Sequence, residues 1–353
     1  MRFDKGISVI ICCYNSSKRL PETLKHLANQ IVTDTLNWEI IIVNNASTDD
    51  TTSVAKSEWS RYKTDIPLLV TDQPIPGQSA AREKGYQIAR YEYLLYVDDD
   101  NWLKSDYLAN VYHIMNQNPQ IGILGGQCNA AFETKPPDWF SEKQSIYAVG
   151  KQGIQNGPLT SKKKYLYGAA SVIRKSALEN LHQRQFRFLT KGRTGTQLAA
   201  GDDVELNKAI RMLGYVLWYD ESLQFTHFMS SGRLNWDYLI RIGKGSASSS
   251  LALMVYDFFL ENKQLSFSKF SKLYLVAVFK RVFTILRQIR PFFRSFTLHK
   301  REGDLAAFDA MRSRIFLKRL LTSFGEASAY FRQIKKIQSN IHIQNHSAEL
   351  FPQ

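Results

Sequence analysis

The sequence has few cysteines and lacks an export signal. Its three cysteines, Cys12, Cys13 and Cys128, are too few for a disulfide framework, and the first two lie in an apolar run typical of a buried strand. We interpret them as small core residues in a reducing cytoplasm. Too few apolar residues precede Asn15 for a secretory segment, and no small-residue cleavage site follows. We therefore do not expect export.

Two common phosphate-binding loops are also missing. Neither a GxGxxG segment nor a GxxxxGK[ST] segment follows any predicted strand. This absence weakens the hypotheses of a dinucleotide-dependent oxidoreductase and of a P-loop NTPase. Any nucleotide would have to be held by side chains and a metal ion instead.

Charge is unevenly distributed along the chain. Of the net charge of +14, residues 262–336 account for +13, because they hold 17 Lys or Arg against 4 Asp or Glu. The rest is close to neutral, as in a cytosolic enzyme domain. With 353 residues and 44% hydrophobic side chains, the chain can bury a substantial core, in one large domain or two smaller ones.

Apolar runs alternate with helical patterns over the first hundred residues. Runs at 7–12, 39–43 and 93–97 predict strands, and segments 20–28 and 79–91 have helical spacing. This alternation predicts an α/β fold with a mostly parallel sheet flanked by helices. In such sheets ligands bind beyond the carboxyl ends of the strands, and polar residues follow each predicted strand.

The pattern is looser after residue 101. Segment 167–181 is compatible with a helix, and the Gly-, Thr- and Lys-rich segment 189–201 is predicted to be a mobile loop. From about Leu251 onward the sequence has a helical pattern and carries most of the basic charge. A mainly helical C-terminal region is therefore expected.

Three consecutive carboxylates, Asp98, Asp99 and Asp100, follow the run at 93–97. They repel one another at this spacing, so a positive partner is expected nearby. Asp98 and Asp100 offer oxygen ligands suited to Mg²⁺ or Mn²⁺, ions that usually complete their shell with diphosphate oxygens and water. The alternative is a solvated acidic turn that caps the next helix.

Two further positions could carry chemistry. Asp202 and Asp203 stand between the predicted loop and a helical pattern. Such a pair often only caps a helix, but a carboxylate fixed behind a loop that closes over substrate also suits a general base. His227 follows a strand-like segment at 216–225; it is either a structural histidine or a ligand for Mn²⁺.

Together these segments resemble the family 2 glycosyltransferases in order and spacing. The matching segments are SVIICCYNSSKRLPETLKHLANQ, WEIIIVNNASTDDT, GQSAAREKGYQIAR, YLLYVDDDNW, YGAASVIRKSALENL and GDDVELNKAIRMLGY. The resemblance covers about residues 6–230 and implies the GT-A fold. It implies a glycosyltransferase domain over 1–235, with a nucleotide-binding part to about 125 and an acceptor-binding part from about 126. The basic helical region, 236–353, would follow.

The resemblance also implies roles for single residues. Asp100 would bind the metal, with Asp98 and His227 completing the site. Asp203 would be the catalytic base, with Asp202 in place of the family's glutamate beside it. The donor nucleotide would contact Tyr14, Asn15, Asn44, Arg82, Asp98 and Asp99. The donor sugar and acceptor would lie against Gly168 and Ala169. Asn44 replaces an aspartate that usually reads the base and ribose.

The implied activity is that of an inverting glycosyltransferase dependent on Mn²⁺ or Mg²⁺. It would move a sugar from a nucleotide-diphosphate sugar to a hydroxyl of a saccharide, lipid-linked or protein acceptor, in cell-surface polysaccharide or lipopolysaccharide synthesis. Two alternatives stay open. A Mg²⁺-dependent nucleotidyltransferase would release pyrophosphate, and an inactive GT-A-fold protein would only bind its ligand.

The apolar stretches within 272–296 are interrupted by Lys280 and Arg281 and end at Arg287. They are too short for a membrane-spanning helix. Segment 262–336 instead suits an interfacial helix on an anionic membrane, which would place the protein at the inner face of the cell membrane. The alternative is a helical bundle with a solvated basic face. We expect no nucleic acid partner, because the aromatic residues here have helix-burying spacing.

Overall fold

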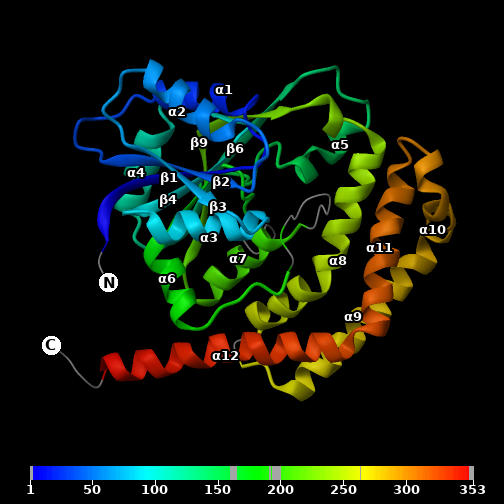
Figure 1. The fold of residues 1–353 in the computed structure, drawn as a ribbon. Helices are drawn as coiled ribbons and strands as arrows, with labels where there is room; N and C mark the ends of the chain where they lie inside the picture. Colours follow the sequence, from blue (N-terminus) through cyan, green and yellow to red (C-terminus); the bar gives the residue numbers. More distant parts are fainter. Residues whose placement is uncertain (1–2, 160–164, 191, 193–199, 263, 350–353) are drawn as a thin grey trace.

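The structure, a computed structural model, describes residues 3–159, 165–190, 192, 200–262 and 264–349, which form one mixed sheet with helices on both faces (Figure 1). The strands are β1 Asp4–Cys13, β2 Trp38–Asn45, β3 Leu68–Gln73, β4 Tyr91–Asp98, β5 Asn101–Leu103, β6 Ile121–Phe132, β7 Gly157–Pro158, β8 Ser171–Arg174 and β9 Val216–Met229. The helices are α1 Leu20–Ala28, α2 Thr51–Arg61, α3 Gln78–Ile88, α4 Tyr107–Gln117, α5 Phe140–Lys143, α6 Lys175–Gln183, α7 Asp202–Met212, α8 Trp236–Glu261, α9 Phe267–Arg287, α10 Ile289–Arg294, α11 Leu305–Thr322 and α12 Phe324–Glu349.

The strand order places the predicted polar residues at one edge of the sheet. It runs β3-β2-β1-β4-β8-β6-β9-β5, with β7 paired to β9. The first four strands are parallel, as the sequence predicts, whereas β8 is antiparallel to both β4 and β6. Cys12 is paired with Asp98, so the carboxyl ends of β1 and β4 lie side by side. The polar residues that follow both strands therefore share one site.

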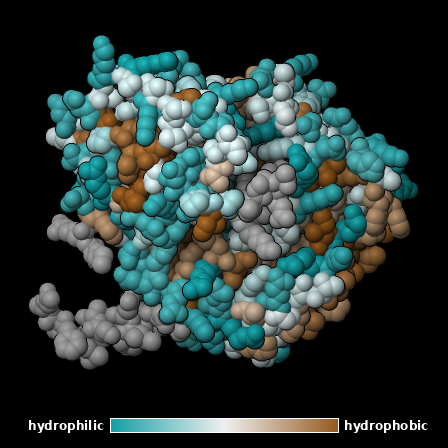
Figure 2. Space-filling view, in the orientation of Figure 1, coloured by the Kyte–Doolittle hydropathy of each residue, from teal (hydrophilic) through white to brown (hydrophobic). Residues whose placement is uncertain are grey.

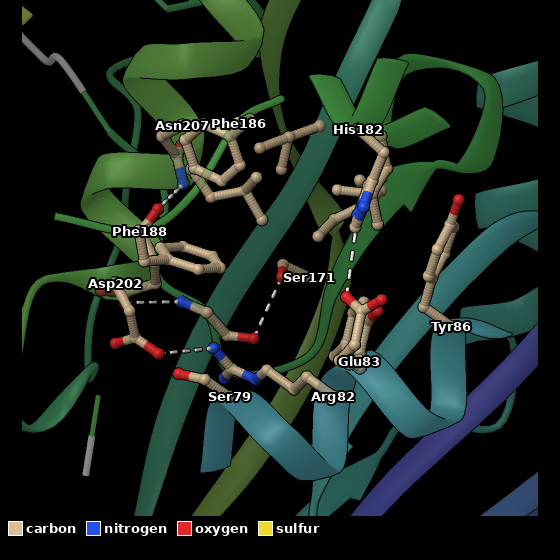
Figure 3. A pocket seen from close by; sticks show the side chains of 17 residues that line it. Ser79, Arg82, Glu83, Tyr86, Ser171, His182, Phe186, Phe188, Asp202 and Asn207 are labelled. Carbon is tan, nitrogen blue, oxygen red and sulfur yellow. Dashed lines mark hydrogen bonds and ion pairs between the residues drawn. The ribbon is translucent and has the colours of Figure 1, made fainter. Parts of the chain in front are cut away.

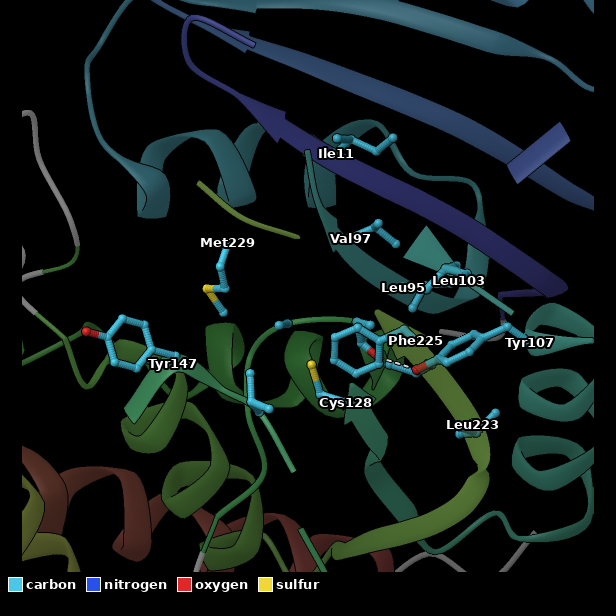
Figure 4. Packing of buried hydrophobic residues seen from close by; sticks show 14 of the residues in the cluster. Ile11, Leu95, Val97, Leu103, Tyr107, Cys128, Tyr147, Leu223, Phe225 and Met229 are labelled. Carbon is cyan, nitrogen blue, oxygen red and sulfur yellow. Dashed lines mark hydrogen bonds between the residues drawn. The ribbon is translucent and has the colours of Figure 1, made fainter. Parts of the chain in front are cut away.

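Both faces of the sheet are buried, which explains why β1 reads as an unbroken apolar run. Val9 and Ile11 pack into one core, together with Leu95 and Phe225 (Figure 4). Ile10 points to the opposite face and packs into a second core with residues of α3, α6, α7, α8 and α12. The two cores hold β1 rigidly, and its carboxyl end carries part of the site.

The C-terminal helices pack directly against these cores. Phe308 of α11 belongs to the same core as Val9 and Ile11. The approach to α8 is close, because a Cβ added to Gly243 would lie 2.6 Å from the Phe308 ring. Helix α8 begins at Trp236, earlier than the helical pattern from Leu251 predicts. In the described part of the chain no helix is both long and apolar enough to span a bilayer. The domain boundary near residue 235 stays a prediction.

Two secondary-structure predictions need correction. Segment 167–181 is not a single helix, because strand β8 occupies its middle and α6 begins only at Lys175. Val172 and Ile173 fill the place between β4 and β6, and this pairing overrides the local helical pattern. The predicted helix at 79–91 ends at Ile88, because Tyr91 begins β4. Within the loop predicted at 189–201, residues 191 and 193–199 lie outside the described residues.

Candidate active site

The loop after β1 is held against the loop after β2. The Asn15 backbone N–H donates to Ser47 Oγ at 3.0 Å, and the Thr48 N–H donates to Asn15 Oδ1 at 2.8 Å. Asn15 adopts a left-handed conformation with φ of 50°, which asparagine tolerates better than most residues. Tyr14 remains 53% exposed beside this turn. The two loops thus form one wall of the site.

An acidic residue, Asp72, lies beside Asn44. Asn44 itself is the residue that replaces the usual aspartate of the resembled family. Asn44 Nδ2 donates to Asp72 Oδ1 at 2.8 Å, and strand pairing sets the two residues opposite each other. Within the described residues the buried Asn44 Oδ1 has no hydrogen-bond partner. Asp72 was missed from the sequence, because only the β2–β3 register reveals it. The carboxylate at this point of the site therefore belongs to the neighbouring strand β3 and not to β2.

The middle carboxylate of the Asp98–Asp100 run faces α1. Asp99 Oδ2 accepts from Arg19 Nη2 at 2.6 Å and from Arg19 Nε at 3.1 Å, and the Ser16 hydroxyl donates to the same oxygen. Thr23 also donates to the Asp99 carbonyl at 2.9 Å. Asp99 is buried, so these bonds tie the strand end to the start of α1. Its predicted contact with a nucleotide stays a prediction.

Asp100 lies on the other side, against the end of β9. Its Oδ2 is 2.9 Å from Arg233 Nη1, and its Oδ1 is 3.4 Å from His227 Nε2. The pairing of Asn101 with His227 in strands β5 and β9 brings these groups together. Burial acts to raise the pKa of Asp100, but His227 and Arg233 outweigh it and hold the pKa well below its ordinary value. Asp100 is therefore ionised at neutral pH.

His227 faces Asp100 with its Nε2. Its Nδ1 is 3.0 Å from the Tyr147 carbonyl oxygen, which can only accept, so Nδ1 carries a proton. In the neutral ring Nε2 then has a lone pair, the form that ligates a metal, and a backbone carbonyl is a common orienting partner for such histidines.

The pair formed by Asp100 and His227 fits part of a metal site. Two neighbouring ligands of an octahedral ion, each about 2.1 Å from it, lie about 3 Å apart, close to the separation of this pair. Among the described residues no three His, Cys, Asp or Glu side chains are grouped to hold an ion, so the predicted third ligand, Asp98, stays a prediction. Substrate oxygens and water would supply further ligands of an ion here.

Asp202 and Asp203 begin α7 and face different partners. Asp203 Oδ2 accepts from the Gly168 N–H at 3.1 Å, and its Oδ1 accepts from the Val204 N–H at 2.8 Å. Asp202 Oδ2 lies 3.4 Å from Arg82 Nη1. A dashed line in Figure 3 marks this ion pair. This ion pair, which joins α7 to α3, could not be read from the sequence.

The environment of Asp203 suits a base. Burial and the neighbouring Asp202 charge raise the pKa of Asp203 above its ordinary value, although Arg82 and the two backbone N–H groups act in the opposite direction. A carboxylate with a raised pKa accepts a proton more readily than an ordinary aspartate does. Its hydrogen bonds to backbone fix where its oxygens point.

A pocket of about 140 Å³ lies between α3, α6 and α7 beside these carboxylates (Figure 3). Its lining includes Gly168, Asp202 and Asp203 and the aromatic side chains of Tyr86 and Phe186. A Cβ on Gly168 would approach Asp203 Cβ to 3.0 Å and Arg82 Nη2 to 3.1 Å, so a side chain here would press on both groups. Ala169 is buried next to it.

Glu205 anchors the chain that leads toward α7 and was not singled out from the sequence. Its carboxylate accepts from the backbone N–H groups of Leu189 and Thr190, at 2.8 Å each, and from the Tyr256 hydroxyl at 3.2 Å. A fully buried glutamate near a helix start gives no distinctive sequence signal, because helix N-termini are commonly acidic.

Comparison with known proteins identifies the family. Residues 8–181 match the model of glycosyl transferase family 2. Through this region the chain belongs to that family. This confirms the resemblance drawn from the sequence, and the match includes the Asp98–Asp100 run and Gly168.

Relatives of known name share parts of this family 2 chain. It is 27% identical over 170 residues to poly(ribitol-phosphate) beta-glucosyltransferase of Bacillus spizizenii, covering 46% of this chain and 26% of that protein. It is 33% identical over 107 residues to the cholesterol galactosyltransferase of Borreliella burgdorferi, covering 30% and 28%. The chain thus matches well under half the length of these relatives.

A solved structure has a similar fold. Staphylococcus aureus TarS, residues 1–349 in complex with UDP-GlcNAc, superposes with a TM-score of 0.51 at 15% identity, over 89% of this chain and 91% of that chain. At this identity the likeness is one of fold. It confirms the predicted GT-A-type α/β architecture with a helical C-terminal region.

Two of the three carboxylates at the end of β4 should differ in their effect on stability. We expect Asp99→Asn to lower the free energy of unfolding by about 1.5–3 kcal/mol, because it weakens buried hydrogen bonds to a charged group. Asp98→Asn should change it by less than about 0.5 kcal/mol, since the Asp98 carboxylate has no hydrogen-bond partner among the described residues. Urea denaturation followed by circular dichroism measures both, and equal values for the two variants would contradict the assignment.

Proposed function

We propose that this family 2 chain transfers a sugar from a nucleotide-diphosphate sugar to an acceptor hydroxyl with inversion at the anomeric carbon. The observation that carries the proposal is the shared pocket in which Asp203, with its raised pKa, lies against Gly168 and near the Arg82–Asp202 pair. The names of the matched relatives and the UDP-GlcNAc bound to TarS support the same class of donor.

The donor nucleotide would lie across the carboxyl ends of β1, β2 and β4. Tyr14 is exposed enough to stack on a base, and Asp72, which accepts a hydrogen bond from Asn44, offers an exposed carboxylate to its polar edge. Arg82 is held in its charged form, because Asp202 and Asp98 outweigh the effect of burial on its pKa. It would face the phosphates or the donor sugar, with Asp98 near the ribose.

Members of family 2 generally depend on a divalent metal. We assign Mn²⁺ or Mg²⁺ to Asp100 and His227, whose donor atoms fit two positions of such an ion. When bound, the ion would neutralise charge that builds on the departing diphosphate. Asp100 is suited to this task because it stays ionised, and His227 because its Nδ1–H is committed to the Tyr147 carbonyl.

Asp203 would act as the general base. In a single displacement the acceptor oxygen attacks the anomeric carbon, the bond to the diphosphate oxygen breaks, and the acceptor proton passes to Asp203. The Gly168 N–H holds the carboxylate in place, and Asp202 holds Arg82. No covalent intermediate is needed, so the anomeric configuration inverts.

Nucleotide binding tests the donor site. We expect one of UDP, GDP, dTDP and CDP to bind in the presence of Mn²⁺ and to lose at least about tenfold in affinity with EDTA or in Asp100→Ala, because Asp100 would hold an ion that neutralises the diphosphate charge. Isothermal titration calorimetry measures this. Binding of none of the four under any metal condition would refute the donor site and favour a protein that binds another ligand. Release of pyrophosphate from a sugar phosphate and a nucleotide would favour the nucleotidyltransferase instead.

The pH profile of turnover tests the base. Asp203 must be deprotonated to work, so kcat/KM should rise with pH through a pKa above the ordinary aspartate value. Asp203→Asn should reduce kcat/KM by at least about a hundredfold. Asp202→Asn removes a neighbouring negative charge, so its acidic limb should move to lower pH. If instead Asp202→Asn abolishes turnover and Asp203→Asn does not, the roles of the two carboxylates are reversed.

We also propose that the enzyme works in the cytoplasm at the inner face of the cell membrane, on a saccharide or lipid-linked acceptor. The support comes from α9, whose buried face is formed by Phe270, Tyr274 and Ile285. Its opposite face is apolar yet exposed, with Phe279 70% and Phe283 59% exposed. Figure 2 shows brown atoms along the lower right rim, where α9 lies in Figure 1.

The apolar face of α9 and α10 is accompanied by basic side chains. The exposed apolar residues are Leu275, Val276, Phe279, Phe283, Leu286, Ile289, Phe293 and Phe296. The exposed basic residues beside them are Lys272, Lys280, Arg287 and Arg290. Such a combination suits an anionic lipid surface, to which each nearby basic residue adds about 1 kcal/mol. A water-facing bundle would gain nothing from this row of phenylalanines.

Vesicle binding tests this surface. The chain should co-sediment with vesicles of phosphatidylcholine and phosphatidylglycerol more strongly than with phosphatidylcholine alone. The triple replacement Phe279→Ser, Phe283→Ser and Leu286→Ser should weaken binding at least tenfold, because burying one such side chain contributes about 1.5–3 kcal/mol. Ile31→Ser, at a residue 70% exposed elsewhere, is the matched control. If the wild type does not bind vesicles but forms dimers, and the triple variant does not form them, this surface is an interface between copies of the chain.

A further inference from the structure

One nitrogen of Arg233 contacts both halves of the proposed metal site. Arg233 Nη1 lies 2.9 Å from Asp100 Oδ2 and 3.0 Å from His227 Nε2. Arginine can only donate hydrogen bonds, so His227 Nε2 must accept this one. That agrees with the proton on Nδ1, which donates to the Tyr147 carbonyl. The guanidinium therefore contacts the lone pair and the carboxylate that a divalent ion would use.

Simultaneous occupancy by both cations is unfavourable. An ion bound to His227 Nε2 needs the lone pair that Arg233 now occupies, and it would stand within a few ångströms of the guanidinium charge. Displacing Arg233 costs its bond to a carboxylate that is only 2% exposed. The apparent affinity for the ion is therefore proportional to the fraction of molecules in which Arg233 does not occupy the site.

Arg233 is placed where it can leave the site. It ends the short 3₁₀ segment Ser231–Arg233 between β9 and α8, and its side chain is 26% exposed, far more than that of Asp100. Its neighbour Gly232 faces open space, because no atom lies within 4 Å of an added Cβ. A guanidinium displaced from Asp100 remains beside the site, where the negative charge of a diphosphate would attract it.

We propose that Arg233 is an internal counter-cation of the Asp100–His227 site, which it occupies in the metal-free protein and leaves for the donor diphosphate when the metal enters. This rests on the proposed function for the identity of the site. It has a consequence for binding order. Metal alone has to displace Arg233 without compensation, whereas metal and nucleotide together give the guanidinium a new partner. Each should therefore raise the affinity for the other by the same factor.

The test measures Mn²⁺ binding directly, by the electron paramagnetic resonance signal of the free ion, first without nucleotide. Arg233→Ala should bind Mn²⁺ at least about fivefold more tightly than the wild type, because the competitor is gone. Arg233→Lys keeps the charge and should remain within about twofold of the wild type. Arg61→Ala, which removes an exposed arginine of α2, is the control for net charge. Asp100→Ala should abolish the binding in every background.

A second arm adds the nucleoside diphosphate that binds in calorimetry. It should tighten Mn²⁺ binding at least about tenfold in the wild type and clearly less in Arg233→Ala. Unchanged or weaker Mn²⁺ binding by Arg233→Ala without nucleotide, while Asp100→Ala still abolishes binding, overturns the role of Arg233 and leaves the metal site standing. Mn²⁺ binding that is unchanged in Asp100→Ala overturns both the role of Arg233 and the metal site. Thermal unfolding of each variant checks that it is folded. If Arg233→Ala does not fold, Arg233→Gln replaces it in both arms.

Discussion

The end of strand β4 places three carboxylates side by side at the edge of a buried sheet, and their charge has to be compensated. Each meets this requirement in a different way. Asp99 pairs with Arg19 of α1, and Asp100 contacts Arg233 and His227 from the end of β9. The Asp98 carboxylate has no such partner among the described residues and influences Arg82 only through its charge. One repulsive cluster thereby fixes how α1 and β9 meet β4.

The same logic separates the two carboxylates at the start of α7. Asp202 is nearly buried and faces Arg82, whereas Asp203 is held by backbone N–H groups at the pocket. Burial and the negative charge of Asp202 together raise the pKa of Asp203, although Arg82 acts in the opposite direction. A structural ion pair and a carboxylate suited to base chemistry thus arise from neighbouring residues with identical side chains.

The C-terminal helices combine two tasks on opposite faces. Phe308 of α11 and the inner face of α8 complete the cores beneath the sheet, so this region is part of the folded body. The outer face of α9 and α10 leaves apolar and basic side chains exposed. Burial of the inner face explains why these helices form and pack, but it does not explain why their outer face is apolar.

The sequence by itself determined the central residues of the parallel strands β1, β2 and β4 and the family, because hydrophobic periodicity and the spacing of short motifs are local properties. It also placed Asp98, Asp100, Asp203 and His227 on a short list. Tertiary structure alone decided which of these meet. Strand β8 forms within a helical pattern because it fills the sheet between β4 and β6.

The same holds for residues that local patterns did not reveal. Asp72 becomes the acid beside Asn44 only through strand register, and Arg233 reaches Asp100 only because β9 pairs with β5. Charge compensation and register act between residues far apart in the chain, and no local pattern encodes them.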